Sequence, residues 1–216
     1  MAAVLINLRA TNGAGKTTVV REIFRASEIC RPLYGAALGP RWPEAYQLKF
    51  RQSNTETFVL GPYNLPTGGC DRIQPYTLIV PLIEKYAERG HVVFEGVLIA
   101  GCWGKVGGLL ERWKHHAVVV FLDTALDVCI ERVRARRLER GDGRSFNPKR
   151  LIAKHRTIAR LKQKIESAGL VPTLSVSSER AATVVINLLE SNNSGGDRDL
   201  RADEYNAVRE AALQQR

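Results

Sequence analysis

The chain has 216 residues, the size of one domain, and 44% of them are hydrophobic, which is enough for one core. No stretch approaches the ~18 apolar residues that span a bilayer, and the first residues lack the layout of a signal peptide, so we expect no membrane partner. The four cysteines are scattered, without a CxxC pair. This excludes a disulfide framework or a zinc site and predicts a cytoplasmic protein.

The net charge of +10 is concentrated in one segment. Residues 131–164 contain thirteen Lys and Arg against three Asp and Glu, so this segment alone accounts for the whole excess. Such a segment is either the solvated surface of a basic helix or a surface for polyanions, namely nucleotide phosphates or a nucleic-acid backbone.

The first half of the chain alternates between predicted strands and helices. Residues 4–8 form a short apolar run that is followed by a glycine-rich turn and an amphipathic stretch, the order of strand, loop and helix. Residues 30–43 are rich in Pro, Gly and aromatics and indicate an irregular segment. The alternating patterns at 46–50 and 57–60 predict two strands with a tight connection. After a loop at 61–74, Pro75 begins a helix that Gly90 ends.

The second half continues the same alternation. Residues 91–95 and 117–122 predict buried strands, with a short helix at 109–113 between them. A long basic helical region follows, and 171–176 and 182–190 predict a last strand and a closing helix. We expect an α/β fold, a three-layer P-loop sandwich with a mostly parallel central sheet and helices on both faces. The main domain would span 1–190 with an Arg-rich lid at about 131–150, and 191–216 would form a flexible linker and a charged tail.

Residues 10–17, Ala-Thr-Asn-Gly-Ala-Gly-Lys-Thr, fit the Walker A pattern GxxxxGK[ST] except at the first position, where Ala10 replaces Gly. The glycines let backbone amides turn toward the phosphates of ATP, Lys16 reaches the same oxygens, and Thr17 offers its hydroxyl to Mg²⁺. Ala10 is tolerated if its φ angle is negative. The loop residues expected to contact ATP are Asn12, Gly13, Ala14, Gly15, Lys16, Thr17 and Thr18.

An arginine-dense helix after Asp123 favours a kinase among the P-loop classes, and the guanine signature of GTPases does not occur. Arg132, Arg136 and Arg140 are spaced four apart and share one helical face. Kinases use such a lid to clamp the transferring phosphoryl group, which makes Arg132 and Arg136 candidate catalytic residues. Arg137, beside them, is a candidate ATP contact. The alternative is an amphipathic surface helix.

Two acidic residues are candidates for the acceptor side. Glu95 ends a predicted strand, where α/β sheets present functional groups, and we expect it to act on the metal or the acceptor. Asp71 lies in a loop before a helix that begins with proline; it is either catalytic or the cap of that helix. We interpret Asp123 as a cap.

Three aromatic residues are weaker candidates for the acceptor site. Trp103 in a glycine-rich loop, with Tyr63 and Tyr76, would stack a nucleobase there. The alternative is that these side chains are packing anchors. His115 and His116 have no third ligand at metal spacing and are interpreted as structural.

The order of Walker A loop, strand-end acid, Arg-rich lid and closing strand and helix resembles the nucleoside/nucleotide-kinase branch of P-loop proteins over about residues 3–190. Within it, residues 6–18, 60–63 with 68–71, and 94–96 are similar to phage-encoded DNA kinases. Those enzymes phosphorylate 5-hydroxymethyl-2′-deoxyuridine (5-hmdU) already in DNA. The resemblance implies ATP and Mg²⁺ at Lys16 and Thr17, acceptor contacts near Asp71 and Glu95, DNA as substrate, and the host cytoplasm as location.

Other functions stay open at this point. The chain would be a kinase of a free nucleoside, nucleotide or small metabolite if the basic segment is only a lid and a solvated surface. It would be a DNA-binding ATPase if ATP is hydrolysed without phosphotransfer, or a regulatory ATP-binding module if there is no turnover. A DNA substrate predicts a steep loss of affinity with salt, because each neutralised backbone phosphate releases counterions.

Overall fold

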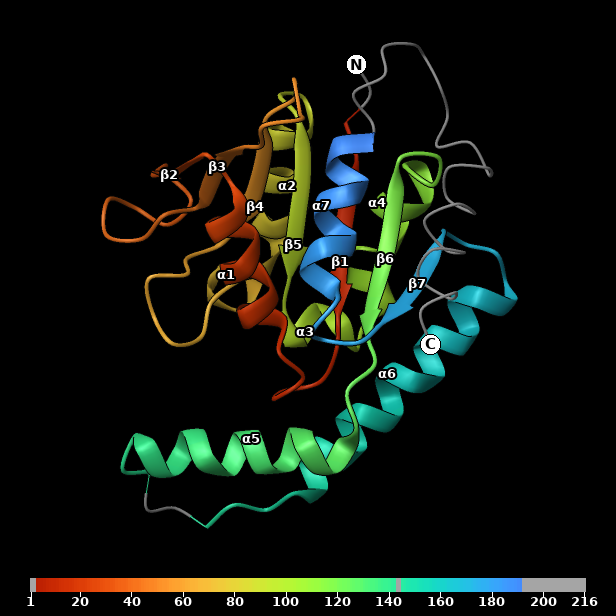
Figure 1. The fold of residues 1–216 in the computed structure, drawn as a ribbon. Coiled ribbons are helices and arrows are strands. Elements are labelled where there is room, and N and C mark those ends of the chain that lie inside the picture. The colour runs from red at the N-terminus through yellow and green to blue at the C-terminus, as the bar shows by residue number, and fades with distance from the viewer. Residues whose placement is uncertain (1–2, 143–144, 192–216) are drawn as a thin grey trace.

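A seven-stranded sheet forms the centre of the computed structural model, which describes residues 3–142 and 145–191 (Figure 1). The strand order is β2-β3-β4-β5-β1-β6-β7. The strands are β1 (Leu5–Arg9), β2 (Ile29–Leu33), β3 (Ala45–Lys49), β4 (Thr57–Leu60), β5 (His91–Glu95), β6 (Ala117–Leu122) and β7 (Thr173–Val176).

Five of the strands are parallel, and this part of the sheet orients the site. β4, β5, β1, β6 and β7 pair with one another in parallel, while β3 runs opposite to both of its neighbours, β2 and β4. Leu8 in β1 lies opposite Glu95 in β5 and Val120 in β6, so the carboxyl ends of these three strands meet at one edge. The expected α/β class with a mostly parallel sheet is confirmed.

Helices cover both faces of the sheet (Figure 1). α1 (Lys16–Ala26) and α7 (Ala181–Ser191) pack on one face, and α2 (Ile79–Ala87) and α4 (Gly107–Arg112) lie on the other. Residues of β1 alternate between the two cores: Ile6 and Leu8 belong to the first, and Leu5 to the second. This is the period of two expected for a strand that is buried on both sides.

Two further helices extend from the carboxyl edge of the sheet. α5 (Leu126–Glu139) follows β6, and α6 (Lys149–Ser167) returns to β7. α6 buries Leu151, Ile158 and Ile165, one residue in seven, and leaves most of its other side chains exposed. None of the helices in the described part of the chain is long and apolar enough to cross a membrane.

Some sequence expectations need correction. Residues 29–33 form strand β2 although Pro32 lies within it; β2 is the edge of the sheet, where a missing backbone donor is tolerated. A short helix, α3 (Val97–Ala100), follows β5 and was not expected. The domain boundaries stay a prediction, because the tail expected at 191–216 lies outside the described residues, except for Ser191 at the end of α7.

His91 at the start of β5 is a buried histidine whose role is structural. Its side chain is fully buried, and Nδ1 accepts a hydrogen bond of 3.0 Å from the backbone N–H of Val4. Nε2 has no partner among the described residues. Burial lowers the pKa of His91 from 6.5 to about 4, because the charged imidazolium is poorly solvated there.

We therefore expect stability to depend on pH through His91. The unfolded state takes up the proton first, so the contribution of neutral His91 is complete above pH ~6.5 and is lost as the pH falls toward 4. The shift corresponds to roughly 3 kcal/mol. His91→Gln should flatten the pH dependence of the urea midpoint in this window, and His115→Gln, which changes an exposed histidine, should not. Equal slopes in wild type and His91→Gln would contradict this assignment.

Candidate active site

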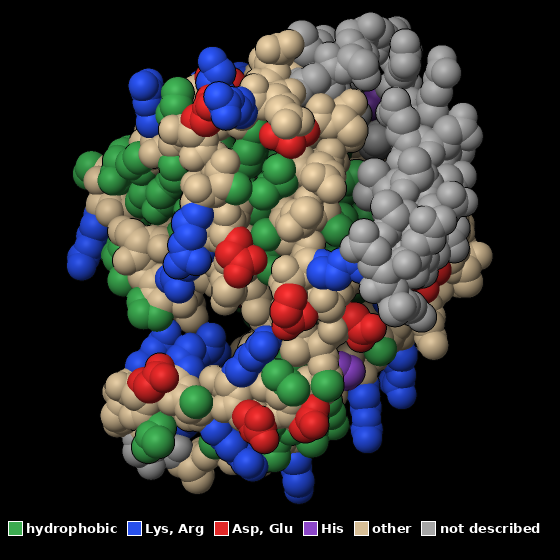
Figure 2. Space-filling model, viewed as in Figure 1, with side chains coloured by type: hydrophobic (Ala, Val, Ile, Leu, Met, Phe, Trp, Pro, Cys, Tyr) green, Lys and Arg blue, Asp and Glu red, His purple; other side chains and the backbone are tan. Residues whose placement is uncertain are grey.

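A large cavity lies at the carboxyl edge of the parallel strands, between the body of the protein and α5. Its volume is about 1130 Å³. Figure 2 shows the hollow between the α5 lobe and the body, with Lys and Arg side chains along it. The residues that line it are Asn12, Gly13, Gly15, Lys16, Thr17, Thr18, Arg21, Glu22, Pro66, Thr67, Gly68, Asp71, Arg72, Glu95, Val97, Arg132, Ala135, Arg136, Glu139, Arg140, Ser178 and Glu179.

The loop between β1 and α1 is built on two glycines with left-handed backbone. Gly13 has φ 82° and Gly15 has φ 99°, conformations that favour glycine. A Cβ at Gly13 would overlap the carbonyl oxygen of Cys129, far inside van der Waals contact, so only glycine fits there. No residue other than glycine has a positive φ in the described chain, so Ala10 meets the condition under which alanine is tolerated at the first position.

Lys16 begins α1 and is almost completely buried. Its Nζ donates to the carbonyl oxygens of Ala10 and Thr11 at 2.9 and 3.1 Å, which leaves one of its three N–H groups for another acceptor. Burial lowers the pKa of Lys16, and the charges of Glu95 and Asp71 raise it. These carboxylates therefore favour the charged ammonium at the bottom of the cavity.

Glu95 ends β5 and is buried beside the loop. Burial raises its pKa to about 7, while the charge of Lys16 and a hydrogen bond from Thr17 oppose this shift. The hydroxyl of Tyr63 donates to Oε1 of Glu95 at 3.4 Å. Burial and the nearby carboxylate raise the pKa of Tyr63 well above its ordinary value, so this hydroxyl keeps its proton. Glu95 is thus a carboxylate fixed in orientation by two hydroxyl donors.

Asp71 lies in the 3₁₀ turn η1 (Cys70–Arg72) and faces the same cavity. Its Oδ2 accepts a hydrogen bond of 2.7 Å from the N–H of Val97, and its Oδ1 accepts one of 3.0 Å from the N–H of Leu98. The carboxylate therefore caps α3, not the helix after Pro75. The expected cap of the helix after Pro75 is therefore wrong, because Asp71 caps a different helix. Asp71 also lines the cavity, and its catalytic role stays a prediction.

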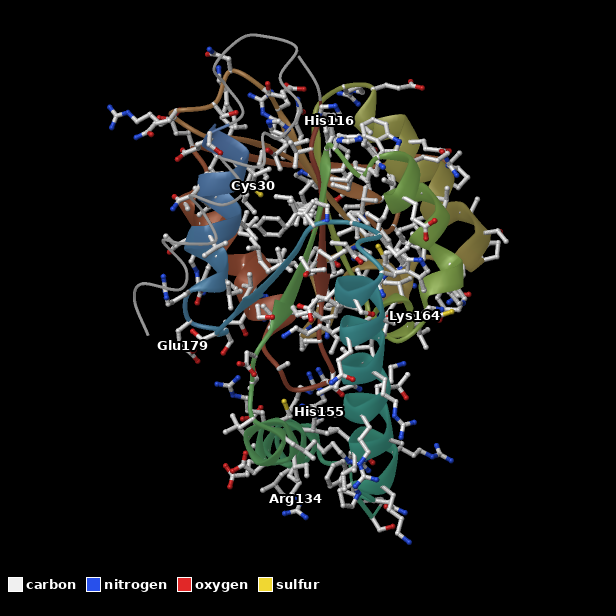
Figure 3. All side chains as sticks on the ribbon, turned by 90° about the vertical axis from the view of Figure 1, so that its right-hand side faces the viewer. Cys30, His116, Arg134, His155, Lys164 and Glu179 are labelled. Carbon is white, nitrogen blue, oxygen red and sulfur yellow. The ribbon has the colours of Figure 1, made fainter. Side chains whose placement is uncertain are left out.

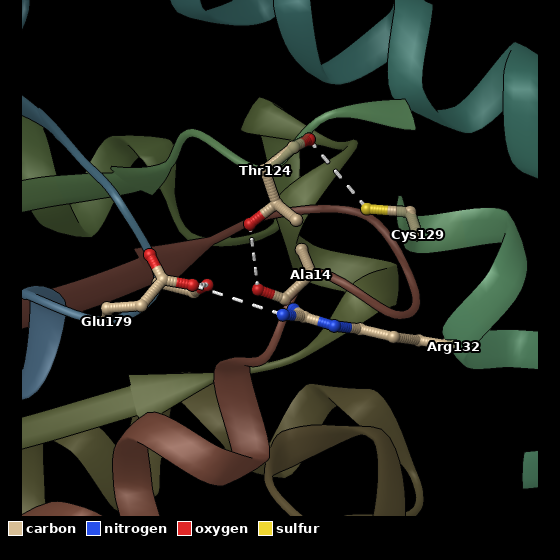
Figure 4. Close-up of polar contacts among 6 residues, drawn as sticks. Ala14, Thr124, Cys129, Arg132 and Glu179 are labelled. Atoms are coloured by element: carbon tan, nitrogen blue, oxygen red, sulfur yellow. Dashed lines mark hydrogen bonds and ion pairs between the residues drawn. The ribbon is translucent and has the colours of Figure 1, made fainter. Parts of the chain in front are cut away.

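The lid helix α5 and the residues just before it contact the phosphate loop directly (Figure 4). The hydroxyl of Thr124 donates to the carbonyl oxygen of Ala14 at 3.0 Å, and Arg132 lies 4.0 Å from Glu179 in the loop after β7. Arg132, Arg136 and Arg140 all line the cavity. Burial and the charge of Arg140 lower the pKa of Arg136, which reflects how closely the cations are grouped.

Most of the predicted site residues lie together. Lys16, Asp71, Glu95, Arg132 and Arg136 share the cavity, and so do the loop residues apart from Ala14. The side chain of Ala14 is buried in the core, so only its backbone is available to ATP.

Arg137 needs correction as an ATP contact. Its guanidinium pairs with Asp142 at 3.2 Å, lies 5.7 Å from the ring centre of Phe146, and does not line the cavity. One residue along a helix turns the side chain by about 100°, so Arg136 and Arg137 face different sides.

The three aromatic candidates also need correction. Tyr63 is buried against Phe24 and donates to Glu95, so its ring is not open for stacking. Trp103 donates to Glu111 at 2.6 Å, and Tyr76 lies beneath Lys105. None of the three lines the cavity. Their interpretation as packing anchors is the correct one.

Sequence reasoning missed several polar residues of the cavity, among them Arg21, Arg72 and Ser178. Arg21 lies four residues after Thr17 on α1, so helical spacing placed it on the same face. Arg72 is adjacent to Asp71. Ser178 comes from the loop after β7, and no motif in the sequence pointed to it.

The cavity fits ATP and Mg²⁺. The phosphate loop leads into the N-terminus of an eleven-residue helix, and a Cβ at Gly15 would meet Ser178 at 3.2 Å, so the backbone stays open to a phosphate. In the described residues no cluster of three or more His, Cys, Asp and Glu would hold a metal ion. Mg²⁺ needs none, because it is bound through one or two protein oxygens together with phosphates and water. Thr17 and Glu95 are suitable ligands.

The space at Gly13 gives a testable prediction. Gly13→Ala combines a left-handed φ with a backbone clash, whereas Gly39→Ala has φ +69° and open space around the new Cβ. Gly39→Ala should cost about 1–2 kcal/mol of stability, the penalty of the left-handed backbone alone. Gly13→Ala should cost clearly more in thermal unfolding and should weaken ATP binding in calorimetry. Equal effects of both changes would show that Cys129 does not confine the loop.

The family model described as 5-hmdU DNA kinase matches residues 75–190, more than half of the chain. A 5-hmdU DNA kinase from Pseudomonas phage PaMx11 is 29% identical over 189 residues, covering 87% of this chain and 97% of the relative. A 5-hmdU DNA kinase from Pseudomonas phage M6 is 28% identical over 175 residues, covering 76% and 86%.

Two more distant matches complete the comparison. A 5-hmdU DNA kinase from Bacillus phage SP10 is 26% identical over 181 aligned positions, and the alignment covers 77% of this chain and 26% of that longer protein. A solved gluconokinase from Sinorhizobium meliloti 1021 aligns over 99% of this chain and 98% of its own, with a TM-score of 0.45 and 20% identity. That likeness carries no argument about the reaction.

Proposed function

Because this chain belongs to the 5-hmdU DNA kinase family, we propose that it transfers the γ-phosphate of ATP to the 5-hydroxymethyl group of hydroxymethyldeoxyuridine within DNA. The relatives from Pseudomonas phages cover most of the chain and carry the same name. Since these relatives are encoded by bacteriophages, we propose that the enzyme acts in the cytoplasm of an infected host cell.

One observation supports the proposed mechanism: the phosphate loop, two carboxylates and the lid arginines line a single cavity. Transfer to a hydroxyl needs a phosphate cradle, a group that takes up the proton of the hydroxyl, and cations for the charge on the transferring phosphoryl group. The lining residues supply each of these. The volume of about 1130 Å³ exceeds the range of roughly 300–1,000 Å³ typical of a pocket for one small molecule.

The chemistry follows from the positions of these groups. Lys16 and the backbone amides of the loop hold the β- and γ-phosphates, and the oxygen of the hydroxymethyl group attacks the γ-phosphorus. The bond between this phosphorus and the oxygen of ADP breaks, and the hydroxyl proton passes to Asp71, which the amides of α3 orient. Arg132 and Arg136 stabilise the developing charge on the phosphoryl oxygens.

Thr17 and Glu95 would hold Mg²⁺ in this arrangement. The ion would neutralise charge on the phosphates and orient them for in-line transfer. Glu95 is buried, and with a pKa of about 7 its side chain is only partly ionised near neutral pH. A bound cation favours its carboxylate form. Tyr63 then keeps the carboxylate in place.

The outer surface of α6 supports DNA as the acceptor. The helix has 19 residues, so it is about 28 Å long. Five of its cations are exposed and form no ion pair among the described residues: Lys149, Arg150, Arg156, Arg160 and Lys164. Figure 3 shows nitrogen-tipped side chains along the outer side of α6, away from the body. A free nucleoside has no use for such a row, whereas a phosphate backbone does.

The position of α6 connects this row to the acceptor side of the cavity. The side chain of Lys154 passes within 3.3–3.5 Å of the place where a Cβ would lie at Gly101, the residue that follows α3. α3 itself carries Val97, which lines the cavity beside Asp71. DNA that runs along α6 therefore reaches the edge of the cavity where the hydroxyl acceptor is needed.

A labelling experiment tests the proposed function. With γ-labelled ATP and Mg²⁺, the wild-type protein should transfer label to DNA that contains 5-hmdU, and digestion should recover the label on that nucleoside. Lys16→Ala should lower the rate by about 100-fold or more while circular dichroism stays unchanged, because the buried ammonium that contacts the phosphates is lost. Label on free nucleosides alone would contradict the proposal and indicate a nucleoside kinase. Release of phosphate without label on DNA would indicate an ATPase.

The α6 surface predicts a salt dependence that mutation can change. Each phosphate contact contributes about 0.7–0.9 to the slope of log affinity against log salt. The triple variant Arg156→Gln, Arg160→Gln and Lys164→Gln should lower this slope for DNA by roughly 2–3. The matched control Arg25→Gln, Arg31→Gln and Lys49→Gln removes three exposed cations near the opposite edge of the sheet and should leave it unchanged. Equal slopes for both triple variants would exclude α6 as the DNA surface.

A further inference from the structure

The strand order divides the cavity into two ends. β6 and β7 lie on one side of β1, and β5 and β4 lie on the other. Arg132 follows β6 on α5, and Ser178 follows β7; both lie beside Gly15, within 3.2–3.7 Å of the position of an added Cβ. The loop after β4 and helix α3 after β5 supply the opposite end. With the phosphates of ATP on the side of Gly15 and Ser178, as the proposed function has them, the second end is left for the acceptor.

Two arginines belong to the acceptor end. Arg21 of α1 donates from Nη2 to the carbonyl oxygen of Leu65 at 2.8 Å, so it is held by the loop after β4. Arg72 follows Asp71 directly in η1 and is exposed toward the cavity. Neither takes part in an ion pair among the described residues, although other arginines of the cavity, such as Arg132, do. Two guanidinium groups with no ion-pair partner in the described part of the chain thus line the same cavity as Asp71, the proposed proton acceptor.

The roles proposed above for the transfer reaction do not require these two cations. The proposed contacts of the ATP phosphates are Lys16, the loop amides and the lid arginines. The uracil ring and its hydroxymethyl group are neutral. What distinguishes a nucleotide inside DNA from a free nucleoside is a phosphodiester on each side, and arginine binds phosphate through paired N–H donors.

We propose that Arg21 and Arg72 bind the phosphodiesters that flank the target nucleotide and so make the acceptor end specific for nucleotides within a DNA chain. This inference rests on the proposed function and assigns a role that the transfer reaction itself does not need. The target base enters the cavity unpaired or turned out of the duplex, while its neighbours stay outside. The two arginines position the substrate; they contact its backbone and not the reacting atoms.

The first test compares two matched double variants. Arg21→Gln with Arg72→Gln should raise KM for a single-stranded oligonucleotide with one 5-hmdU about tenfold or more, with kcat within about twofold and KM for ATP unchanged. The control Arg25→Gln with Arg31→Gln removes two exposed cations outside the cavity and should leave all three values unchanged. Thermal unfolding of both variants verifies that each is folded.

The second test identifies the contacted phosphates with a thermodynamic cycle that combines the arginine variant with a chemical change in the DNA. Oligonucleotides whose two phosphodiesters flanking 5-hmdU are replaced by neutral methylphosphonates should bind wild type about tenfold more weakly. The double variant should lose little on the same replacement, because the contact is already absent. A purely structural role of the arginines would not produce this coupling.

Two results would overturn the inference. A rise of KM for ATP with no change for the oligonucleotide would assign the arginines to the donor side. Independent, additive losses from the variant and from the methylphosphonates would show that they do not touch these phosphates. Failure of the proposed function is a separate outcome: it would appear as the absence of label on 5-hmdU DNA with the wild-type protein.

Discussion

The arrangement of the site depends on how closely the phosphate loop approaches the first turns of α5. Gly13 lies against the carbonyl of Cys129 with no room for a side chain, and Thr124 donates to Ala14 from the same segment. The loop after β1 and the lid helix after β6 are therefore one packed unit. Because neighbouring parallel strands end at the same edge, this packing directs the lid arginines toward the helix N-terminus where phosphates bind.

The electrostatics of the cavity balance cations against carboxylates at close range. Six of its lining residues are Lys or Arg and five are Asp or Glu. Lys16 is buried beside Glu95 and Asp71: burial lowers the pKa of Lys16, and the charges of the two carboxylates oppose this shift. Tyr63 and the amides of α3 orient the two carboxylates. Such preorganised groups stabilise a charged transition state without further rearrangement.

The two helices that extend beyond the sheet, α5 and α6, present their cations in different directions. α5 turns one cationic face toward the cavity, and α6 buries a narrow apolar stripe and exposes a row of cations to solvent. The described part of the basic segment at 131–164 thus presents two surfaces, which we propose as contacts for nucleotide phosphates on α5 and for a DNA backbone on α6. The excess of positive charge in the sequence belongs to both.

Sequence alone determined the elements whose chemistry is local. The Walker A loop, the strand ending at Glu95 and the four-residue spacing of Arg132, Arg136 and Arg140 each follow from short-range pattern, and the structure brings all of them to one cavity. Only the tertiary structure decided which distant segments meet there. It set Arg137 on the far side with Asp142, buried Tyr63 beneath Glu95, made Asp71 the cap of α3, and added Arg21, Arg72 and Ser178. The physical reason is that strand order and packing determine these contacts. Local residue types and spacings do not show which distant segments of the chain will meet.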